Sequence, residues 1–491
     1  MMDCEKNTIN NLGLGSLVLM ERAGLFAASA CLELKPKRVL VLCGTGNNGA
    51  DGIVVGRLLA KHDILVDLLV LGDRKKASCE NIHQLDTFIK IYGSLNIKYS
   101  ISQVDFSKYD LFVDGIFGIN LNRPLTGDFL LAVNLVNEEA ARHKAKVLSL
   151  DIPSGLNSTN GLIYNQCIKA DITTSFGFLK LGHYLGQGRN FSGKILLDSV
   201  GIEGSTASAL PRALEKEDVI NYLKREPVSN KSTYGKALII AGADGMPGAA
   251  LMATYGALKS GLGMAYLVTG RDNMASILEL VPEAMVGDMD AITNNDLSAK
   301  LDWCDVVLIG PGLGTSNRSK ELVEYISVNA KVPVIYDADG LNILADNKEI
   351  IVSRAKMGGL SILTPHPMEF ARVFGSDIRD KKHQDIDFIT KEAIKYNAII
   401  IAKDATSVIT NGQQVYVNIY GNPGMSCGGS GDVLAGVVAA MCGRFSDYLY
   451  AAAIGTCIHS LAGDYAKDIY GVSYMTPMNI IESIKVILGG D

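Results

Sequence analysis

The sequence lacks several features that would assign it to a large class of proteins. Its 491 residues include nine cysteines but no C-x-x-C pair, so neither a disulfide framework nor a zinc site of that type is expected. There is no uninterrupted apolar run of about eighteen residues, which argues against a membrane span. The first six residues lack the basic and then apolar order of a signal peptide. We therefore expect a cytoplasmic protein with reduced thiols.

Excess positive charge is also absent. Lysine and arginine number 46 against 52 aspartates and glutamates, giving a net charge of -6, and no basic block stands out. General affinity for nucleic acid or for a membrane surface is therefore not expected. The chain also has no G-x-x-x-x-G-K-[ST] motif, which excludes a Walker-type nucleotide site.

Short β-branched segments alternate with longer helical patterns along the chain, which predicts an α/β fold with doubly wound sheets. Several of these segments are continuously apolar, as in parallel strands buried on both faces. The pattern weakens between residues 201 and 225, so we place a first domain at 1–212 and a second at 226–491. The expected strands are 38–42, 64–71, 111–113, 147–150, 172–176, 194–197, 236–241, 265–269, 306–309, 334–337, 361–364, 399–402 and 407–410, and expected helices include 16–30, 248–261 and 432–441.

A glycine-rich turn follows the first strand. Gly44, Gly46 and Gly49 have the G-x-G-x-x-G spacing of dinucleotide-binding turns. A purely structural glycine turn has the same appearance. A nicotinamide coenzyme site would also need an acid at the end of the second strand, and Asp73 meets this requirement only in part.

Polar residues follow several strands at the edge where ligands bind in open α/β sheets. Asn48, Asp114, Asp151 and Ser154 are expected to converge there. Their carboxylate, amide and hydroxyl oxygens suit a hard cation. Each could instead be a turn or helix-capping residue.

Taken together, five segments of the first half resemble the NAD(P)HX epimerase family. They are residues 19–24, 44–52, 113–118, 151–155 and 176–182. The resemblance covers about residues 1–212 and implies a Rossmann-like domain that binds a damaged nicotinamide dinucleotide as its substrate.

The same resemblance implies roles for individual residues. Asp151 and Lys180 would be an acid/base pair acting on the hydroxylated ring, although Lys180 could be a plain surface lysine. Asn48, Asp114 and Ser154 would hold potassium. Ala50 and Asn120 stand where the family usually has glycine. The hydrated coenzyme would contact Asn47, Asn48, Gly49, Ala50, Asp51, Gly118, Arg123 and Asp151.

The strongest motif of the second half is residues 421–432, which contain five glycines and end in an acid ahead of a helical pattern. Backbone N–H groups at such a helix start form an anion site. Asp432 could act there as a base toward a hydroxyl beside a bound phosphate. The alternative is that Ser430 or Asp432 is only a helix cap.

This arrangement resembles the ribokinase-like fold, an α/β sandwich. Residues 231–242, 248–250, 309–314, 336–342 and 363–369 narrow the resemblance to the ADP- or ATP-dependent NAD(P)HX dehydratase. It implies that the nucleotide phosphorylates the ring hydroxyl, and that phosphate then leaves. Fusion of both halves in one chain points to ADP as the donor, with magnesium as its cation.

Binding residues follow from this second resemblance. His366, between two prolines, could instead be structural. Met368, Asp404, Gly340 and the Ser426–Cys427 pair depart from the family pattern. The hydrated coenzyme would contact Ala249, Gly314, His366 and Asp432, and ADP would contact Lys403, Asp404, Ala405, Thr406, Ser407, Asn422, Gly428, Gly429, Ser430 and Gly431.

The sequence thus predicts a bifunctional enzyme that epimerises R- and S-NAD(P)HX and dehydrates the S form to NADH or NADPH. Its partners would be the small-molecule substrates NADHX, NADPHX and ADP, and a homo-oligomer is expected. Two alternatives remain: a vitamin or sugar kinase with an appended Rossmann-like domain, and a first half that is a non-catalytic binding module.

Overall fold

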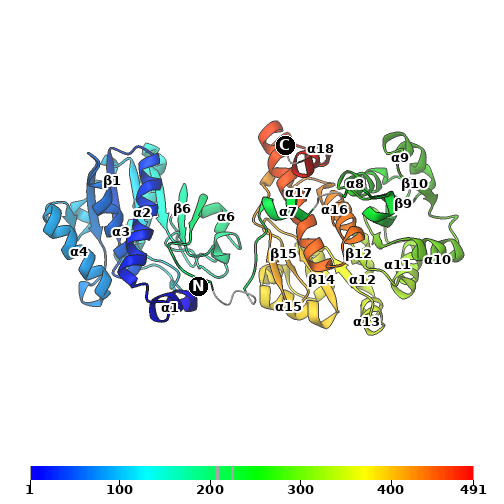
Figure 1. Ribbon diagram of the computed structural model, residues 1–491, viewed down its shortest axis with the longest axis horizontal. Helices are drawn as coiled ribbons and strands as arrows, with labels where there is room; N and C mark the ends of the chain where they lie inside the picture. Colours follow the sequence, from blue (N-terminus) through cyan, green and yellow to red (C-terminus); the bar gives the residue numbers. More distant parts are fainter. Residues whose placement is uncertain (1, 205–209, 223–225, 490–491) are drawn as a thin grey trace. The chain divides into compact units, whose positions relative to one another are not determined.

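The computed structural model describes residues 2–204, 210–222 and 226–489. The chain divides into two compact units, Met1–Ala207 and Ser208–Asp491 (Figure 1). Within the described residues, none of the helices combines the length and the apolar character needed to cross a bilayer.

The first unit is a seven-stranded, wholly parallel sheet in the order β3-β2-β1-β4-β5-β6-β7. Alternate residues of the apolar β1 face two separate cores: Val39 and Val41 pack on one face of the sheet, Leu40 and Leu42 on the other. Strand order reverses between β1 and β4, which opens a crevice at their carboxyl ends. The strands are β1 (Arg38–Cys43), β2 (Leu65–Val70), β3 (Ile97–Lys98), β4 (Leu111–Gly115), β5 (Lys146–Leu150), β6 (Ile172–Phe176) and β7 (Lys194–Asp198), and the helices are α1 (Met2–Asn10), α2 (Ser16–Glu33), α3 (Asn47–Leu59), α4 (Cys79–Tyr92), α5 (Gly127–His143) and α6 (Gly188–Phe191).

The second unit is a nine-stranded sheet in the order β10-β9-β8-β11-β12-β13-β14-β15-β16. Only the last two pairings, β14 with β15 and β15 with β16, are antiparallel. The strands are β8 (Lys236–Ile240), β9 (Met264–Thr269), β10 (Met285–Asp288), β11 (Val306–Ile309), β12 (Val334–Tyr336), β13 (Ser361–Leu363), β14 (Ala398–Ala402), β15 (Val408–Thr410) and β16 (Val415–Val417). The helices are α7 (Lys216–Tyr222), α8 (Pro247–Lys259), α9 (Met274–Leu280), α10 (Asn294–Trp303), α11 (Asn317–Asn329), α12 (Asp339–Asp346), α13 (Glu349–Lys356), α14 (Pro367–Phe374), α15 (Ile386–Lys395), α16 (Ser430–Arg444), α17 (Tyr448–Tyr470) and α18 (Pro477–Gly489).

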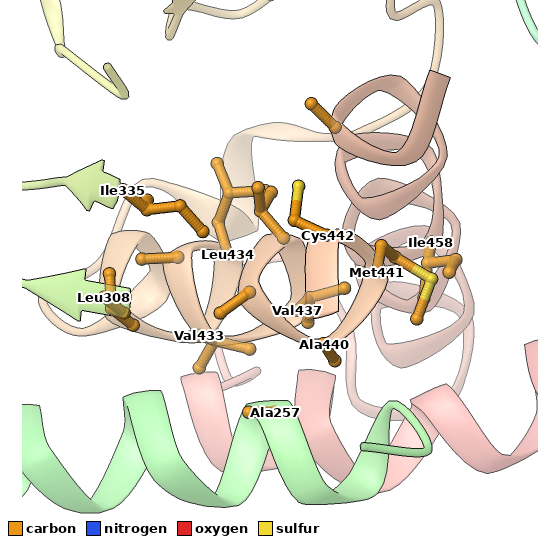
Figure 2. Packing of buried hydrophobic residues seen from close by; sticks show 14 of the residues in the cluster. Ala257, Leu308, Ile335, Val433, Leu434, Val437, Ala440, Met441, Cys442 and Ile458 are labelled. Atoms are coloured by element: carbon orange, nitrogen blue, oxygen red, sulfur yellow. The ribbon is translucent and has the colours of Figure 1, made fainter. Parts of the chain in front are cut away.

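Helix α16 is the centre of the second core. Val433, Val437 and Met441 lie on it, with α8 below and α17 beside it (Figure 2). Small residues let α8 and α16 approach closely: a Cβ on Gly436 would lie 2.0 Å from the Ala253 carbonyl oxygen. This packing fixes the first turn of α16, which carries the predicted base, against the sheet.

The predicted α/β architecture is confirmed, and the strands expected from the sequence are present within one or two residues. Strands β3, β10 and β16 were not expected. All three are short strands at the edges of their sheets. Strand β3 has two residues and β10 contains glycine and aspartate, whereas β16 is apolar but only three residues long. Arg212, placed at the end of the first domain by the sequence, joins the second unit, because its backbone forms a bridge with Tyr416.

Candidate active sites

The first unit contains a cavity of about 730 Å³ at the carboxyl ends of its central strands. Its wall is formed by the turn after β1, the loop after β4, Asp151 after β5 and parts of α1 and α2. Gly49 and Ala50 are buried in the packing of α3. The predicted contact residues in the wall are Asn47, Asn48, Asp51, Gly118, Arg123 and Asp151.

Two glycines of the β1–α3 turn, Gly44 and Gly49, are required by close packing, whereas a Cβ on Gly46 would meet no described atom within 4 Å. A Cβ on Gly44 would lie 2.0 Å from the Ile116 carbonyl oxygen, and one on Gly49 would lie 1.9 Å from the Gly44 carbonyl oxygen. The turn is therefore pressed against the loop after β4, and this contact defines the floor of the cavity.

Two departures from the family pattern are accommodated without backbone strain. Ala50 lies inside α3, is 0% exposed and packs with Met20 and Val54. Asn120 lies in the cavity wall. Neither residue has a positive φ, so neither position needs the conformational freedom of glycine.

Asp151 and Lys180 form a buried ion pair, each residue being 7% exposed. Lys180 also donates hydrogen bonds to Ser175 Oγ at 3.0 Å and to the Phe176 carbonyl oxygen at 2.8 Å. Burial lowers the pKa of Lys180, against the opposing effect of Asp151. Lys180 is therefore buried, so the surface-lysine alternative is wrong, and its role as part of an acid/base pair stays a prediction.

The backbone at Asp151 is strained. Its φ is +65°, in the left-handed region that non-glycine residues seldom adopt. The carboxylate accepts the Phe176 N–H at 3.2 Å, and the backbone oxygen lies 2.9 Å from His183 Nε2. Burial lowers the pKa of His183 to about 4, so this ring is neutral and acts as a hydrogen-bond partner. Such overdetermined strain is typical of functional positions.

The structure brings Asn48, Asp114 and Ser154 together: Asn48 and Ser154 bond the backbone of Phe117, and Ser154 bonds Asp114. Their role as potassium ligands stays a prediction. Asn48 Nδ2 donates to the Phe117 carbonyl oxygen at 2.9 Å, and Ser154 Oγ donates to Asp114 Oδ1 at 2.6 Å. Asp114 is 0% exposed, and burial raises its pKa against the hydrogen bonds from Ser154. Its described hydrogen-bond donors are neutral groups, Ser149, Ser154 and the Ile116 N–H.

Helix α1 contributes cavity residues that the sequence analysis missed. Glu5, Lys6 and Ile9 line the wall. The first helix predicted from the sequence begins at Ser16, because the earlier segment has few apolar residues. The helical spacing of Cys4 and the fully buried Thr8 is the signal that could have revealed α1.

In the second unit, Lys403 stands among several carboxylates. Its Nζ donates to Asp337 Oδ1 at 2.7 Å, and Thr364 Oγ1 donates to the same oxygen at 2.7 Å. Burial alone would lower the pKa of Lys403, but Asp337 and then Glu369 raise it above its ordinary value. Lys403 is therefore a cation at neutral pH.

Asp432 lies in the first turn of α16, facing this group. Burial and then the charge of Asp337 raise its pKa to about 7, and Lys403 opposes the shift. Among the described residues, none donates a hydrogen bond to its carboxyl group. The helix-cap alternative for Asp432 is thereby disfavoured, since a cap accepts backbone N–H groups.

The glycine-rich turn before α16 packs closely on α8 and lies beside Lys403, and its role as an anion site stays a prediction. Gly429 precedes the helix with φ +96°, and a Cβ there would lie 2.4 Å from the Met252 side chain. A Cβ on Gly431 would lie 3.5 Å from Lys403 Nζ, so the lysine reaches the helix start. Asn422 shapes the approach by accepting the Gly424 N–H at 3.0 Å.

His366 caps α14. Its Nδ1 accepts the N–H of Met368 at 3.1 Å and that of Glu369 at 3.4 Å, and its Nε2 lies 3.2 Å from Glu369 Oε1. Burial lowers the pKa of His366, which keeps the ring neutral. Both nitrogens are thus engaged by the helix, which supports the structural alternative, while the side chain stays 44% exposed for a ligand to contact.

The side-chain carboxylate of Asp404 points toward His383 and Gln384 of the same unit. Its Oδ2 accepts hydrogen bonds from His383, at 3.1 Å, and from Gln384. Burial opposes the change, but these hydrogen bonds lower the pKa of Asp404. The negative charge is held by the segment ahead of α15. Its neighbours Thr406 and Ser407 are buried, 4% and 7% exposed.

Gly314 and Ala249 lie in adjacent turns. Ala249 would be 2.7 Å from a Cβ on Gly312. The Gly314 N–H donates to Asp339 Oδ2 at 2.8 Å, while a Cβ on Gly314 would meet no described atom within 4 Å. The open side of Gly314 lets a ligand approach the backbone.

The structure also locates the other residues that differ from the dehydratase family pattern. Met368 is 58% exposed on the surface of α14. A Cβ on Gly340 would lie 2.7 Å from the Ile309 carbonyl oxygen, so alanine here would need a local shift. Cys427 is partly exposed in the glycine-rich turn.

Comparison with known proteins matches each unit separately. The family model for NAD(P)H-hydrate dehydratase matches residues 237–486, and that for the YjeF-related protein N-terminus matches residues 16–182. The second unit resembles solved structures of a ribokinase-like superfamily protein from Enterococcus faecalis (25% identity, TM-score 0.51, covering 56% of this chain and 96% of that one) and a hypothetical protein from Streptococcus mutans (27%, 0.50, 57% and 99%).

Full-length relatives share both units. The bifunctional NAD(P)H-hydrate repair enzyme of Escherichia coli K12 is 31% identical over 99% of this chain and 92% of its own length. That of Thermofilum pendens is 30% identical over 99% and 94%. Together with the cavity, the buried Asp151–Lys180 pair and the glycine-rich turn ahead of Asp432, these matches show that the chain belongs to the family of bifunctional NAD(P)H-hydrate repair enzymes.

Proposed function

We propose that the first unit interconverts R- and S-NAD(P)HX, with Asp151 and Lys180 as its proton-transferring pair. The observation that carries this proposal is the burial of the pair, whose Asp151 lines the 730 Å³ cavity. Burial lowers the pKa of Lys180, which makes its ammonium group a better proton donor near neutral pH. Asn47, Asn48, Asp51, Gly118 and the Arg123 side chain would orient the coenzyme.

Potassium fits the oxygen cluster of the first unit. The buried Asp114 carboxylate has only neutral described partners, and the side-chain oxygens of Asn48 and Ser154 with the Phe117 carbonyl complete an all-oxygen set. Such a set suits a hard cation and not a thiophilic metal. When bound, potassium would neutralise the Asp114 charge and help to fix the loop after β4.

We propose that the second unit dehydrates S-NAD(P)HX with ADP as phosphoryl donor. Asp432 takes the proton of the ring hydroxyl, and the hydroxyl oxygen attacks the terminal phosphorus of ADP, releasing AMP. Loss of phosphate, together with a ring proton, then restores the dihydropyridine. The supporting observation is the carboxyl group of Asp432, with a pKa of about 7, beside the cationic Lys403 and the glycine-rich turn.

Magnesium would enter with the nucleotide. The described residues contain no preformed group of three or more His, Cys, Asp or Glu side chains able to hold a metal ion. Magnesium in such sites is held by phosphate oxygens and one or two carboxylates, and carboxylates surround Lys403. Lys403, Ala405, Thr406, Ser407, Asn422 and Gly428–Gly431 would bind ADP, with Asp404 turned away from it.

The test supplies the protein with mixed R- and S-NADHX, magnesium, potassium and either ADP or ATP, and follows the absorbance of reduced nicotinamide. We expect full recovery, faster with ADP than with ATP. Lys180→Met should recover only the S fraction at the normal rate, and Asp432→Asn should recover none while still equilibrating the epimers. Formation of a stable phosphorylated alcohol without NADH would favour a small-molecule kinase and refute the dehydratase proposal.

We also propose that the enzyme is a cytoplasmic homo-oligomer. Leu17, Val18 and Leu25 on α2 are 38%, 50% and 59% exposed, which leaves apolar surface for a second copy. The described cysteines are all free thiols, as a reducing compartment requires. Light scattering of the eluted protein tests the assembly, and a monomer mass at micromolar concentration would refute it.

A further inference from the structure

Helix α17 holds the start of the glycine-rich turn, residues 421–432. Asp464 on this helix accepts two hydrogen bonds from the turn: Oδ2 accepts the Gly421 N–H at 2.9 Å, and Oδ1 accepts Asn422 Nδ2 at 3.0 Å. Asn422 Nδ2 also donates to the carbonyl oxygen of Gly463, the preceding residue of α17, at 2.9 Å. The start of the turn is therefore tied to α17 by three hydrogen bonds.

Both N–H donors of the Asn422 amide are used inside the chain. Nδ2 has two acceptors, on Gly463 and Asp464, and Oδ1 accepts the Gly424 N–H at 3.0 Å. A side-chain amide has only two N–H donors. The side chain of Asn422 therefore fixes the turn, and a direct bond from its amide donors to a nucleotide would break one of these contacts.

The same helix also contacts the other end of the turn. His459 Nε2 lies 3.4 Å from Ser430 Oγ, and both side chains are buried. Ser430 is the first residue of α16. His459 and Gly463 are four positions apart, so they lie on the same face of α17. Both ends of the turn therefore rest against α17.

This anchoring matters because the turn contains five glycines. A free glycine-rich segment has many conformations, and ordering it on association would weaken the binding of a nucleotide. Contacts within the chain supply the order: the Met425 N–H donates to the Asn422 carbonyl oxygen at 3.1 Å. A Cβ on Gly463 would lie 2.4 Å from Met425 Sδ, so α17 also packs closely against the turn.

We infer that Asp464 is a positioning residue of the dehydratase: by holding Gly421 and Asn422, it keeps the glycine-rich turn in the shape that binds the phosphates of the nucleotide. Asp464 acts through the turn and touches neither the nucleotide nor the hydrated coenzyme. The inference rests on the proposed dehydratase function, in which the nucleotide binds at this turn.

Loss of the Asp464 contacts should weaken nucleotide binding with little effect on turnover. Asp432 lies on α16, which the core fixes, and Lys403 is held by its ion pair with Asp337, so neither depends on α17 through the turn. Asp464→Asn keeps the shape of the side chain but places an N–H group against donors of the turn, so one of the two bonds is lost. If the binding-competent fraction of the turn falls to about a tenth, the KM for the nucleotide should rise about tenfold, while kcat and the KM for S-NADHX should change by less than about twofold.

The test measures dehydration of S-NADHX by the full chain, with magnesium and varied concentrations of the nucleotide that it uses, ADP or ATP, from the absorbance of reduced nicotinamide. Asp468→Asn is the matched control. It removes the same charge one turn further along α17, where the side chain is 70% exposed, and should keep the wild-type KM. Calorimetry with the same nucleotide checks that a change in KM is a change in affinity. The urea transition of the second unit, followed by the fluorescence of Trp303 in α10, shows whether each variant is folded.

A reversed pair tests the contact itself. Asn422→Asp puts a carboxylate against that of Asp464, and should raise the KM for the nucleotide by at least about thirtyfold, since like charges repel at hydrogen-bond distance. Adding Asp464→Asn restores a donor and an acceptor in exchanged positions and returns the net charge to that of the wild type. The double variant should therefore recover about tenfold of that loss, while the contact with Gly463 stays broken.

The outcomes separate the inference from the function on which it rests. A wild type that dehydrates S-NADHX with neither ADP nor ATP would refute the dehydratase proposal itself. With an active wild type, an Asp464→Asn variant with the same KM for the nucleotide as Asp468→Asn would refute the role of Asp464. A variant that loses kcat at unchanged KM would show only a loss of folded protein, and a double variant no better than Asn422→Asp would show that the contact has no effect. Either of these two results would also refute the inference.

Discussion

Breaking the buried Asp151–Lys180 ion pair is expected to lower both the stability of the first unit and its epimerase activity. Substituting Lys180 by Met removes a side chain whose exposed fraction is 5%, facing an Asp151 side chain that is 10% exposed. It also removes donors to Ser175 Oγ and the Phe176 carbonyl oxygen. Breaking a buried pair in this way costs about 3–5 kcal/mol, because the remaining charge has no partner.

The cavity beside the pair determines how much stability the Lys180→Met substitution costs within the range of about 3–5 kcal/mol. Water can enter the 730 Å³ cavity and solvate Asp151 in part, so we expect a loss near the lower limit, about 3 kcal/mol in the first unit. The double variant Asp151→Asn, Lys180→Met removes the unpaired charge, and should recover about 2 kcal/mol of that loss. Both variants should lose epimerase activity by at least about a hundredfold, since both lack the proton-transferring pair.

Urea unfolding of the full chain can measure the change in the free energy of unfolding for each unit. The protein has a single tryptophan, Trp303 in α10 of the second unit, so its fluorescence follows that unit alone. Circular dichroism follows both units. We expect the variants to shift a circular-dichroism transition to lower urea with no change in the fluorescence transition. A Lys180→Met protein as stable as wild type, or a double variant less stable than the single one, would refute the argument from the buried charge.

Three further predictions follow from the same geometry. Dehydratase activity should rise with pH through about 7, because Asp432 acts as a base only when deprotonated, and a pH-independent rate between 5 and 9 would contradict this. A carboxyl group whose pKa is raised in the folded state lowers stability as the pH rises toward that pKa. Asp432→Asn should therefore stabilise the second unit at pH 8 by roughly 2 kcal/mol, measured by Trp303 fluorescence. Asp114→Asn should abolish the dependence of epimerase activity on potassium over sodium, measured by salt titration, and a variant that keeps full potassium dependence would exclude Asp114 as a ligand. Asp404→Gly should change the affinity for ADP, measured by calorimetry, by less than about twofold, because the carboxylate is held by His383; a tenfold gain would show that its charge reaches the nucleotide.

Much of the fold was predictable because strands and helices have characteristic local patterns of apolar residues. Continuously apolar segments such as Arg38–Cys43 indicate strands buried on both faces, and the structure confirms them. Strand β3, with two residues, and the edge strand β10, with glycine and aspartate, have no such pattern, and β16 is apolar but only three residues long.

Within the sites, sequence motifs identified groups whose chemistry is set locally. Asp151, Lys180 and Asp432 were chosen by residue type and by their place in motifs. The structure buries Asp151 and Lys180 as an ion pair and places the partly buried Asp432 in the first turn of α16. The glycines of the β1–α3 turn were also expected, and the structure gives a packing reason for two of them: Gly44 contacts the loop after β4, and Gly49 contacts Gly44.

The sequence by itself determined the two α/β units, the family motifs and the candidate proton-transferring groups, because these depend on apolar periodicity and on residues close together in the chain. Only the tertiary structure decided that Glu5 enters the epimerase cavity, that His366 caps α14, and that Asp404 turns toward His383. These outcomes depend on which groups share a desolvated space. That is fixed by contacts between distant segments, which local sequence patterns do not encode.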